Sequence, residues 1–376
     1  MLKTRKLDKL GIEVKLLGFG CMRFPTKDGE IDEMLAEEML DAAYKAGVNY
    51  FDTAYVYHDG KSESFVGKVL NKYPRDSYYI ATKLPVWSLQ TKEDVRRVID
   101  EQFARLDKDV IDFYLLHSMQ KKTWDKALEF EALKVIEEYR SAGKIKYVGF
   151  SFHDSYEVFE EIINYYDWDF CQIQYNYVDT EIQAGIKGYN LTKEKGIPLV
   201  IMEPIKGGSL ATLPSDVVAP FKKAHPEWSD ASWALRFVAS HENVKVILSG
   251  MSTLDQVKDN IKTFEDLNTL SDDDMEVIKA VAKTIKERTR NGCTGCKYCM
   301  PCPAGVDIPN NFAAWNTYYK YGSERAASWS ARAVKASEGF AEKCVKCGLC
   351  ESVCPQHLNI REDLEKITIE MKKFYE

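Results

Sequence analysis

Short apolar runs alternate with longer amphipathic stretches from the start of the chain to about residue 265. The runs are rich in β-branched and aromatic residues and do not alternate strictly with polar positions, which is typical of strands buried on both faces. The eight runs are LLGFG (16–20), VNYFDT (48–53), YYIATK (78–83), VIDFYLLH (110–117), IKYVGFS (145–151), FCQIQY (170–175), IPLVIM (197–202) and VKVILSG (244–250). We expect each of them to form a strand.

Helical patterns lie between most of these runs, for example EMLAEEMLDAAYKAG (33–47) and KEDVRRVIDEQFARL (92–106). Gly47, Gly143 and Gly196 stand where helix C-caps would lie. Repeated strand–helix units favour a parallel sheet, and eight of them predict a (β/α)₈ TIM barrel. A doubly wound sheet is the rival fold, but no GxGxxG follows the first strand.

The composition changes abruptly after a charged helical stretch, LSDDDMEVIKAVAKTIKERTR (270–290). Beyond it come cysteines and prolines, then an aromatic-rich helical insert, then cysteines again. We therefore expect a barrel over 1–270, a helical connector over 271–290 and a small, mainly helical domain over 291–376.

Four polar residues follow the predicted strands at their C-terminal ends, where barrel active sites lie. They are Asp52, Tyr57, Lys83 and His117. A carbonyl that receives a hydride needs a proton on its oxygen, and tyrosine, whose ordinary pKa is about 10, donates one more readily beside a lysine ammonium. An aspartate would pair with that lysine, and a histidine would orient the carbonyl. Taken singly, each residue is equally well read as an ordinary structural polar group.

From about residue 2 to 265 the chain resembles the aldo-keto reductase family. The resemblance rests on GFGCMRFP, on the DTAxxY spacing, on the lysine of ATK and on the histidine of LLH. It implies that Asp52, Tyr57, Lys83 and His117 form the family's catalytic tetrad. It also implies a nicotinamide cofactor, NADP or NAD, that lies across the barrel mouth without a Rossmann fold.

The resemblance further implies a set of cofactor-binding residues. They are Gly20, Cys21, Met22, Ser151, Gln172, Met202, Glu203, Gly207, Gly208, Gly250, Ser252, Gln256, Asp259 and Asn260. Ser151 and Gln172 would hold the carboxamide, and the stretch from Ser252 to Asn260 would take the adenosine end. The sequence departs from the family at Phe152 and Met202, and SGMSTLDQ holds no lysine or arginine for a 2′-phosphate. NADP stays the first expectation, with NAD as the alternative.

Ten cysteines are present, and only Cys21 and Cys171 precede residue 293. Cys21 is also well explained as a small buried hydrophobe. The remaining eight fall into two groups: Cys293, Cys296, Cys299 and Cys302, then Cys344, Cys347, Cys350 and Cys354. The second group matches C-x₂-C-x₂-C-x₃-C-P, the bacterial ferredoxin pattern for [4Fe–4S] clusters.

In this pattern the fourth cysteine of each run ligates the other cluster. One cluster would then take Cys293, Cys296, Cys299 and Cys354, and the other would take Cys344, Cys347, Cys350 and Cys302. The first run has only two residues before Cys302, so the ligation by Cys302 stays open. Structural zinc is the alternative, although zinc ribbons use cysteine pairs.

Composition and charge limit the classes of molecule that we expect the protein to bind. The 376 residues are 45% hydrophobic and 29% charged, with a formal net charge of −7. This charge argues against nucleic acid and gives no reason to expect an anionic membrane surface. The opening MLKTRKLDKLG lacks the apolar stretch of a signal peptide, and no apolar run is long enough to span a membrane, so we expect a cytoplasmic protein.

Three functions remain open. The first is an NAD(P)H-dependent oxidoreductase for a small carbonyl or alcohol, coupled to two [4Fe–4S] clusters and to a ferredoxin or flavodoxin-type electron-transfer partner. The second is a plain carbonyl reductase whose cluster domain is structural or redox-sensing. The third is a non-catalytic regulatory or binding subunit, against which the intact tetrad speaks. The substrate, the direction of electron flow and the oligomeric state are not fixed by the sequence.

Overall fold

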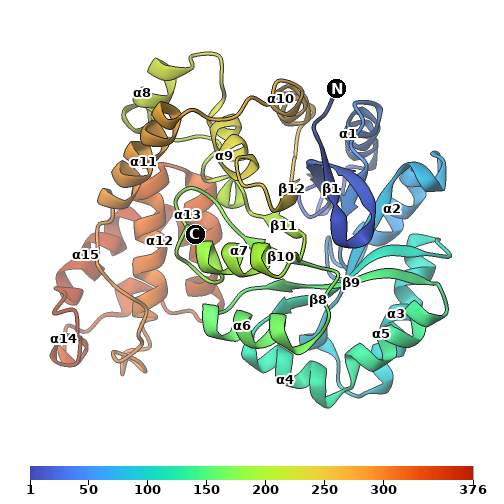
Figure 1. Ribbon diagram of the computed structural model, residues 1–376. Helices are drawn as coiled ribbons and strands as arrows, with labels where there is room; N and C mark the ends of the chain where they lie inside the picture. Colours follow the sequence, from blue (N-terminus) through green and yellow to red (C-terminus); the bar gives the residue numbers. More distant parts are fainter. Residues whose placement is uncertain (376) are drawn as a thin grey trace. The chain divides into compact units, whose positions relative to one another are not determined.

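The chain folds around a closed barrel of eight parallel strands, as a computed structural model that describes residues 1–375 shows (Figure 1). The strands join in the order β10–β11–β12–β3–β6–β7–β8–β9, and β9 pairs with β10 to close the ring. Their bounds are β3 (Leu17–Gly20), β6 (Tyr50–Asp52), β7 (Tyr79–Leu84), β8 (Ile111–Met119), β9 (Ile145–Phe152), β10 (Phe170–Gln174), β11 (Leu199–Met202) and β12 (Val244–Ser249). All eight apolar runs are confirmed as strands.

Helices surround the strands (Figure 1). They are α1 (Glu33–Lys45), α2 (Ser62–Leu70), α3 (Glu93–Leu106), α4 (Lys121–Glu129), α5 (Ala132–Ser141), α6 (Tyr156–Tyr165), α7 (Gly185–Glu194), α9 (Asp230–Ala239) and α10 (Leu254–Glu265). Gly47, Gly143 and Gly196 follow α1, α5 and α7 with φ values of 102°, 73° and 66°. This is the left-handed conformation expected just beyond a helix end.

Two short hairpins were not expected from the pattern. In the first, β1 (Thr4–Leu7) pairs antiparallel with β2 (Ile12–Lys15). Its Leu7 and Val14 are fully buried and belong to one apolar cluster with strand residues such as Tyr50 and Phe113. The hairpin therefore adds to the barrel core. The second hairpin joins β4 (Thr26–Lys27) to β5 (Glu30–Ile31) and is exposed.

The described chain divides into two compact units. One comprises Met1–Ile205 and Ser232–Ser271, and the other comprises Lys206–Ala231 and the described residues from Asp272 onward. This division differs from the linear boundary expected near residue 270, because 206–231 group with the C-terminal residues. Within that unit Arg288 pairs with Asp216 at 2.6 Å and His225 with Asp274 at 2.9 Å. Asp216 lies on α8 (Ser215–Ala224) and His225 directly follows it, whereas Asp274 lies on α11 (Asp272–Glu287) and Arg288 directly follows that helix. The two contacts therefore link α8 to α11.

The C-terminal unit has its own apolar core. The aromatic insert forms α12 (Ile308–Tyr321) and α13 (Glu324–Ala336), and the chain continues through α14 (Leu349–Ser352), α15 (Ile360–Glu370) and α16 (Lys372–Tyr375). Phe312 and Trp315 of α12 belong to one cluster with Leu364 and Ile367 of α15, and six of the eight cysteines pack against it. The insert thus packs together with the cysteine motifs in one core. No helix of the described residues is both long and apolar enough to cross a membrane.

Candidate active site and cysteine motifs

Three of the four predicted catalytic residues meet at one ammonium group. Lys83, on β7, donates hydrogen bonds from Nζ to Asp52 Oδ1 at 2.6 Å, to the Thr53 carbonyl oxygen at 2.7 Å and to the Tyr57 hydroxyl at 3.4 Å. Asp52 ends the neighbouring strand β6, and Tyr57 follows it in the loop before α2. Lys83 and Asp52 are buried. The ammonium therefore joins the carboxylate to the tyrosine.

His117, on β8, completes the group. Its ring lies 5.9 Å from the Tyr57 ring, edge to face, and 4.9 Å from the ring of Trp87. Its buried Nδ1 has no hydrogen-bond partner among residues 1–375. The structure thus brings all four predicted residues to the same end of neighbouring strands.

Burial dominates the electrostatics of this group. It raises the pKa of the Tyr57 hydroxyl, and the Lys83 ammonium opposes the rise. Burial also works against the charge of Lys83, but Asp52 and Tyr57 outweigh it and raise the pKa of the ammonium. Burial, then Lys83 and His153, hold the pKa of His117 well below its ordinary value. At neutral pH the site contains a protonated tyrosine, a charged lysine and a neutral histidine.

Two of the predicted cofactor residues are cross-strand neighbours. Gln172 on β10 pairs in register with Ser151 on β9. The Ser151 hydroxyl oxygen accepts from the Ser118 amide at 2.7 Å, and Gln172 Nε2 lies 3.5 Å from Met202 Sδ. The buried Gln172 Oε1 has no partner within the described part of the chain. An amide that keeps a free acceptor beside a serine suits recognition of a carboxamide, so these residues fit a nicotinamide.

Strands β3 and β12 approach each other closely at Gly20 and Gly250. A Cβ on Gly20 would lie 3.4 Å from the Gly250 amide, and one on Gly250 would lie 2.7 Å from Arg23 Cγ. Ser252 donates from its hydroxyl to the Arg23 carbonyl oxygen at 2.7 Å. Arg23, from the loop after β3, was not singled out in the sequence. The Cβ and Cγ atoms of Arg23 lie beside Gly250 at the same strand ends.

The other predicted cofactor residues have simpler surroundings. Cys21 is fully buried and Met22 is exposed. Gln256 accepts from the Ser252 amide at 2.8 Å, and Asn260 donates to the Ser249 hydroxyl at 2.8 Å. Glu203 and Gln256 are exposed, Asp259 is half-buried, and Gly207 and Gly208 lie in the C-terminal unit. Cofactor contacts by all these residues remain predictions.

His153 is a further polar residue near His117 that the sequence pattern did not single out. It follows β9, and its amide donates to the Met119 carbonyl oxygen at 3.0 Å. Burial lowers the pKa of its imidazole, with Glu203 and Gln183 opposing. The only signal in the sequence was the histidine of GFSFH, just after Ser151.

The eight clustered cysteines line two cavities in the C-terminal unit. One cavity is lined by Cys302, Cys344, Cys347 and Cys350, with Cys299 also at its wall. The other is lined by Cys293, Cys296, Cys299 and Cys354. These are the two ligand sets that the exchange of fourth cysteines predicts. Cys302 stands with the second motif despite its shorter spacing.

Cysteine thiolates are ligands for both iron–sulfur clusters and zinc. No three His, Cys, Asp or Glu side chains of residues 1–375 converge closely enough to hold one metal ion. A zinc ion holds its sulfurs at about 2.3 Å, whereas four cysteines on a cubane each bind a different iron and stand farther apart. Burial raises the pKa of the Cys299 thiol to about 11, so an iron bound by this residue would replace the thiol proton.

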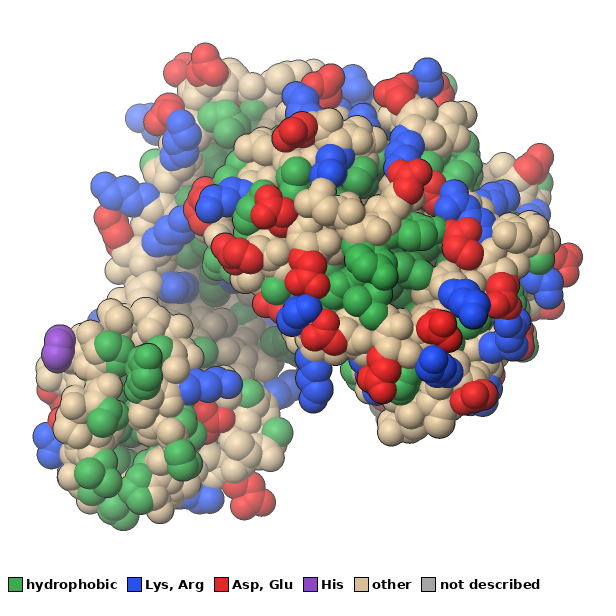
Figure 2. Space-filling view, turned by 60° about the horizontal axis from the view of Figure 1, so that its bottom comes forward, with side chains coloured by type: hydrophobic (Ala, Val, Ile, Leu, Met, Phe, Trp, Pro, Cys, Tyr) green, Lys and Arg blue, Asp and Glu red, His purple; other side chains and the backbone are tan. Residues whose placement is uncertain are grey.

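Apolar side chains surround the cavity that contains Cys302. Tyr298, Val345, Leu349 and Val353 line it and are exposed on the surface. Figure 2 shows such hydrophobic side chains in green on the lobe at lower left. Such a shell limits water access to a bound cluster and affects its potential.

The model of the aldo/keto reductase family matches residues 16–283, and that of the 4Fe-4S dicluster domain matches residues 292–359. The NADH-specific methylglyoxal reductase of Escherichia coli is 25% identical over 74% of this chain and 96% of that protein. The L-galactose dehydrogenase of Arabidopsis thaliana is 23% identical over 77% and 97%. A solved aldo-keto reductase from Bacillus halodurans, in its holo form, is 27% identical with a TM-score of 0.64 over 75% of this chain and 96% of that one.

Proposed function

We propose, since this chain belongs to the aldo/keto reductase family, that it interconverts a small carbonyl compound and its alcohol with NAD(P)H, and that two [4Fe–4S] clusters exchange electrons with this reaction. The observation that carries the proposal is the contact between Lys83 Nζ and Tyr57 Oη at 3.4 Å. It connects a half-buried acid, the Tyr57 hydroxyl, to a buried ammonium at the end of the barrel where active sites lie.

In this proposal Tyr57 donates the proton that the carbonyl oxygen needs. Lys83 supports the negative charge that forms on the tyrosine, and Asp52 keeps Lys83 charged in a buried site. Neutral His117 donates a hydrogen bond to the carbonyl oxygen and orients it. Because burial raises the pKa of Tyr57, the tyrosine is protonated at neutral pH. The resting site is therefore prepared for reduction of a carbonyl.

The barrel residues that would hold the nicotinamide cofactor are those at the strand ends. Ser151 and Gln172 would bind the carboxamide, and Gly20 and Gly250 would allow its closest approach to the backbone. A bound nicotinamide would supply the hydride. We expect NADP to be used through Arg23, with NAD as the alternative, since one relative carries the name of an NADH-specific enzyme.

The two cysteine sets would hold the clusters, and each cluster would carry one electron. The overall exchange balances: NAD(P)H and two oxidised clusters give NAD(P)⁺, one proton and two reduced clusters. Cys299 lines both cavities, which supports electron transfer between the clusters. The exposed apolar side chains of Tyr298 and Val345, beside the Cys302 cavity, would bind a ferredoxin or flavodoxin-type partner.

Two other functions remain as alternatives. A plain carbonyl reductase with a structural or redox-sensing tail is supported by the packing of the cysteines against the C-terminal core. A regulatory subunit is disfavoured by the contacts of Lys83 with Asp52 and Tyr57.

Turnover with a panel of aldehydes, ketones and α-dicarbonyls tests the catalytic part of the proposal. We expect NADPH or NADH oxidation by the wild type and a loss of at least about 100-fold in Tyr57→Phe, since a proton donor contributes about 10²- to 10⁴-fold. Equal rates for the two proteins would contradict the role of Tyr57. Activity of Tyr57→Phe on none of the panel, together with an inactive wild type that binds a partner tightly, would favour the regulatory subunit.

A further inference from the structure

The turn that follows Tyr57 is strained. His58, Asp59 and Gly60 have φ values of 51°, 54° and 85°, so three consecutive residues are left-handed. Only glycine adopts this conformation without a steric penalty. The Tyr57 carbonyl oxygen accepts from the Gly60 amide at 3.1 Å and from the Ser62 amide at 3.2 Å. Strain of this kind persists where surrounding groups hold the backbone in place.

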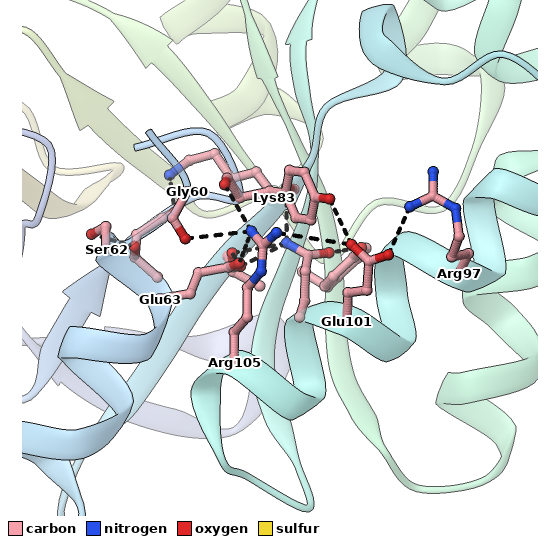
Figure 3. A network of polar contacts seen from close by, with 12 residues as sticks. Gly60, Ser62, Glu63, Lys83, Arg97, Glu101 and Arg105 are labelled. Carbon is pink, nitrogen blue, oxygen red and sulfur yellow. Dashed lines mark hydrogen bonds and ion pairs between the residues drawn. The ribbon is translucent and has the colours of Figure 1, made fainter. Parts of the chain in front are cut away.

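Arg105, on α3, makes the contacts that hold this turn. Its guanidinium donates from one nitrogen to the Tyr55 carbonyl oxygen at 3.2 Å and to the Gly60 carbonyl oxygen at 3.5 Å. These two carbonyls lie on either side of Tyr57 in the chain. The guanidinium also stacks over the Tyr55 ring, with 4.0 Å between its carbon and the ring centroid. One side chain therefore hydrogen-bonds to the backbone on both sides of Tyr57 (Figure 3).

Two carboxylates lie beside Arg105 as ion-pair partners. Its nitrogens lie 3.5 Å from Glu63 Oε2 and 3.9 Å from Glu101 Oε2. Glu101 also accepts from the Tyr55 hydroxyl at 2.6 Å. Figure 3 shows Glu63 and Glu101 pointing toward Arg105 from α2 and α3. A guanidinium with its planar fork can serve these partners together, whereas a single ammonium cannot.

The same cluster of polar groups reaches the strand that carries Lys83. The buried Glu63 accepts through Oε1 from the Thr82 hydroxyl at 2.6 Å and from Gln102 Nε2 at 2.8 Å. Gln102 also donates to the Lys83 carbonyl oxygen at 3.0 Å. Glu63 thus lies between Arg105, which contacts the Tyr57 loop, and Gln102, which hydrogen-bonds to the backbone of Lys83.

We propose that Arg105 is a positioning residue: it holds the strained turn after Tyr57 and keeps the tyrosine hydroxyl beside the Lys83 ammonium. The inference rests on the proposed function, since the position of Tyr57 matters only if it donates the proton. It predicts that loss of Arg105 slows the chemical step and leaves cofactor binding intact.

The test compares Arg105→Met and Arg105→Lys with a control on the same helix, Arg97→Met. Arg97 binds the same carboxylate, Glu101, at 2.7 Å, but its other partner is Asp94 of α3. We expect kcat with an active carbonyl to fall about 100-fold in Arg105→Met, because a misplacement of about 1 Å costs about that much. The Kd for NADPH or NADH, measured by fluorescence, stays within about threefold, Arg105→Lys recovers part of the loss, and Arg97→Met keeps kcat within about twofold.

Hydrogen–deuterium exchange over residues 55–62 gives a measurement that does not depend on turnover. We expect at least about tenfold faster exchange in Arg105→Met than in Arg97→Met, because local opening sets amide exchange; Arg105→Lys replaces Arg105→Met if the latter does not fold. Equal exchange, or an unchanged kcat in Arg105→Met while Tyr57→Phe is inactive, would overturn the inference alone. Normal turnover by Tyr57→Phe would instead overturn the proposed function.

Discussion

Lys83 Nζ and Asp52 Oδ1 lie 2.6 Å apart, and both side chains are buried. The two charges compensate each other directly, because both are shielded from solvent. Loss of one partner leaves a buried charge without compensation, whereas loss of both does not. Stability and activity can therefore be separated at this pair.

Lys83→Met should lower the free energy of unfolding by about 3–5 kcal/mol, the usual cost of breaking a buried pair. The double variant Lys83→Met/Asp52→Asn should regain most of that stability, because the uncompensated carboxylate is gone. Its carbonyl turnover should stay at least about 100-fold below wild type, since Tyr57 lacks the ammonium. Chemical denaturation and steady-state kinetics on the same samples measure both effects. A double variant with wild-type turnover would contradict the role of Lys83.

The two cysteine cavities predict which substitutions remove the same cluster and therefore the same amount of iron. The wild type should hold about eight irons and each single alanine variant about four, if loss of one ligand releases a four-iron cluster. Cys293→Ala/Cys354→Ala should lose no more iron than either single variant, since both residues line one cavity. Cys293→Ala/Cys302→Ala should lose both clusters. Cys171→Ala, a buried barrel cysteine, is the control; iron loss in a different pairing would refute the exchanged ligands.

Arg23 should contribute to cofactor affinity. Its side chain lies against Gly250, and its carbonyl oxygen accepts from Ser252. We expect Arg23→Met to raise the KM for NADPH about tenfold, which corresponds to about 1.4 kcal/mol, and to raise the KM for NADH less. Lys27→Met, on the exposed β4, should change neither. An unchanged KM for both cofactors would exclude Arg23 from the binding site.

Half-buried histidines should make the protein less stable in mild acid. Burial lowers the pKa of His58, His117, His153 and His241. The unfolded chain therefore binds protons below its ordinary histidine pKa of about 6.5 while the folded chain does not, so stability falls as pH falls. The decrease in Tm from pH 7 to 5.5 should be smaller in His241→Gln than in wild type, and the two should have parallel pH dependences above pH 7. Equal slopes in both ranges would contradict this.

The barrel could be predicted because each strand is a short apolar run bounded by helical sequence. The convergence of Asp52, Lys83 and His117 could be predicted because all three end such runs, and strand ends of a barrel converge. The hairpin at 4–15 was missed because its strands are only four residues long and carry few apolar positions.

The features that the sequence did not predict depend on contacts between residues that are far apart in the chain. Glu63 and Gln102 look like surface residues of amphipathic helices, and nothing in their neighbourhood shows that they hydrogen-bond each other inside the protein. The grouping of 206–231 with the C-terminal residues depends on pairs such as Arg288–Asp216, which are 72 positions apart. Residue type alone does not reveal such a partner.

The measurement that tests the central claim most directly is the EPR spectrum of the anaerobically purified protein after addition of NADPH or NADH. Dithionite shows which signals the two clusters can give, and Cys344→Ala/Cys347→Ala identifies the signal of the cluster in the Cys302 cavity. We predict that reduced nicotinamide produces the same cluster signals as dithionite and that an oxidised ferredoxin or flavodoxin removes them. Unreduced clusters, together with normal carbonyl turnover in the double cysteine variant, would contradict the coupling of the barrel reaction to the clusters.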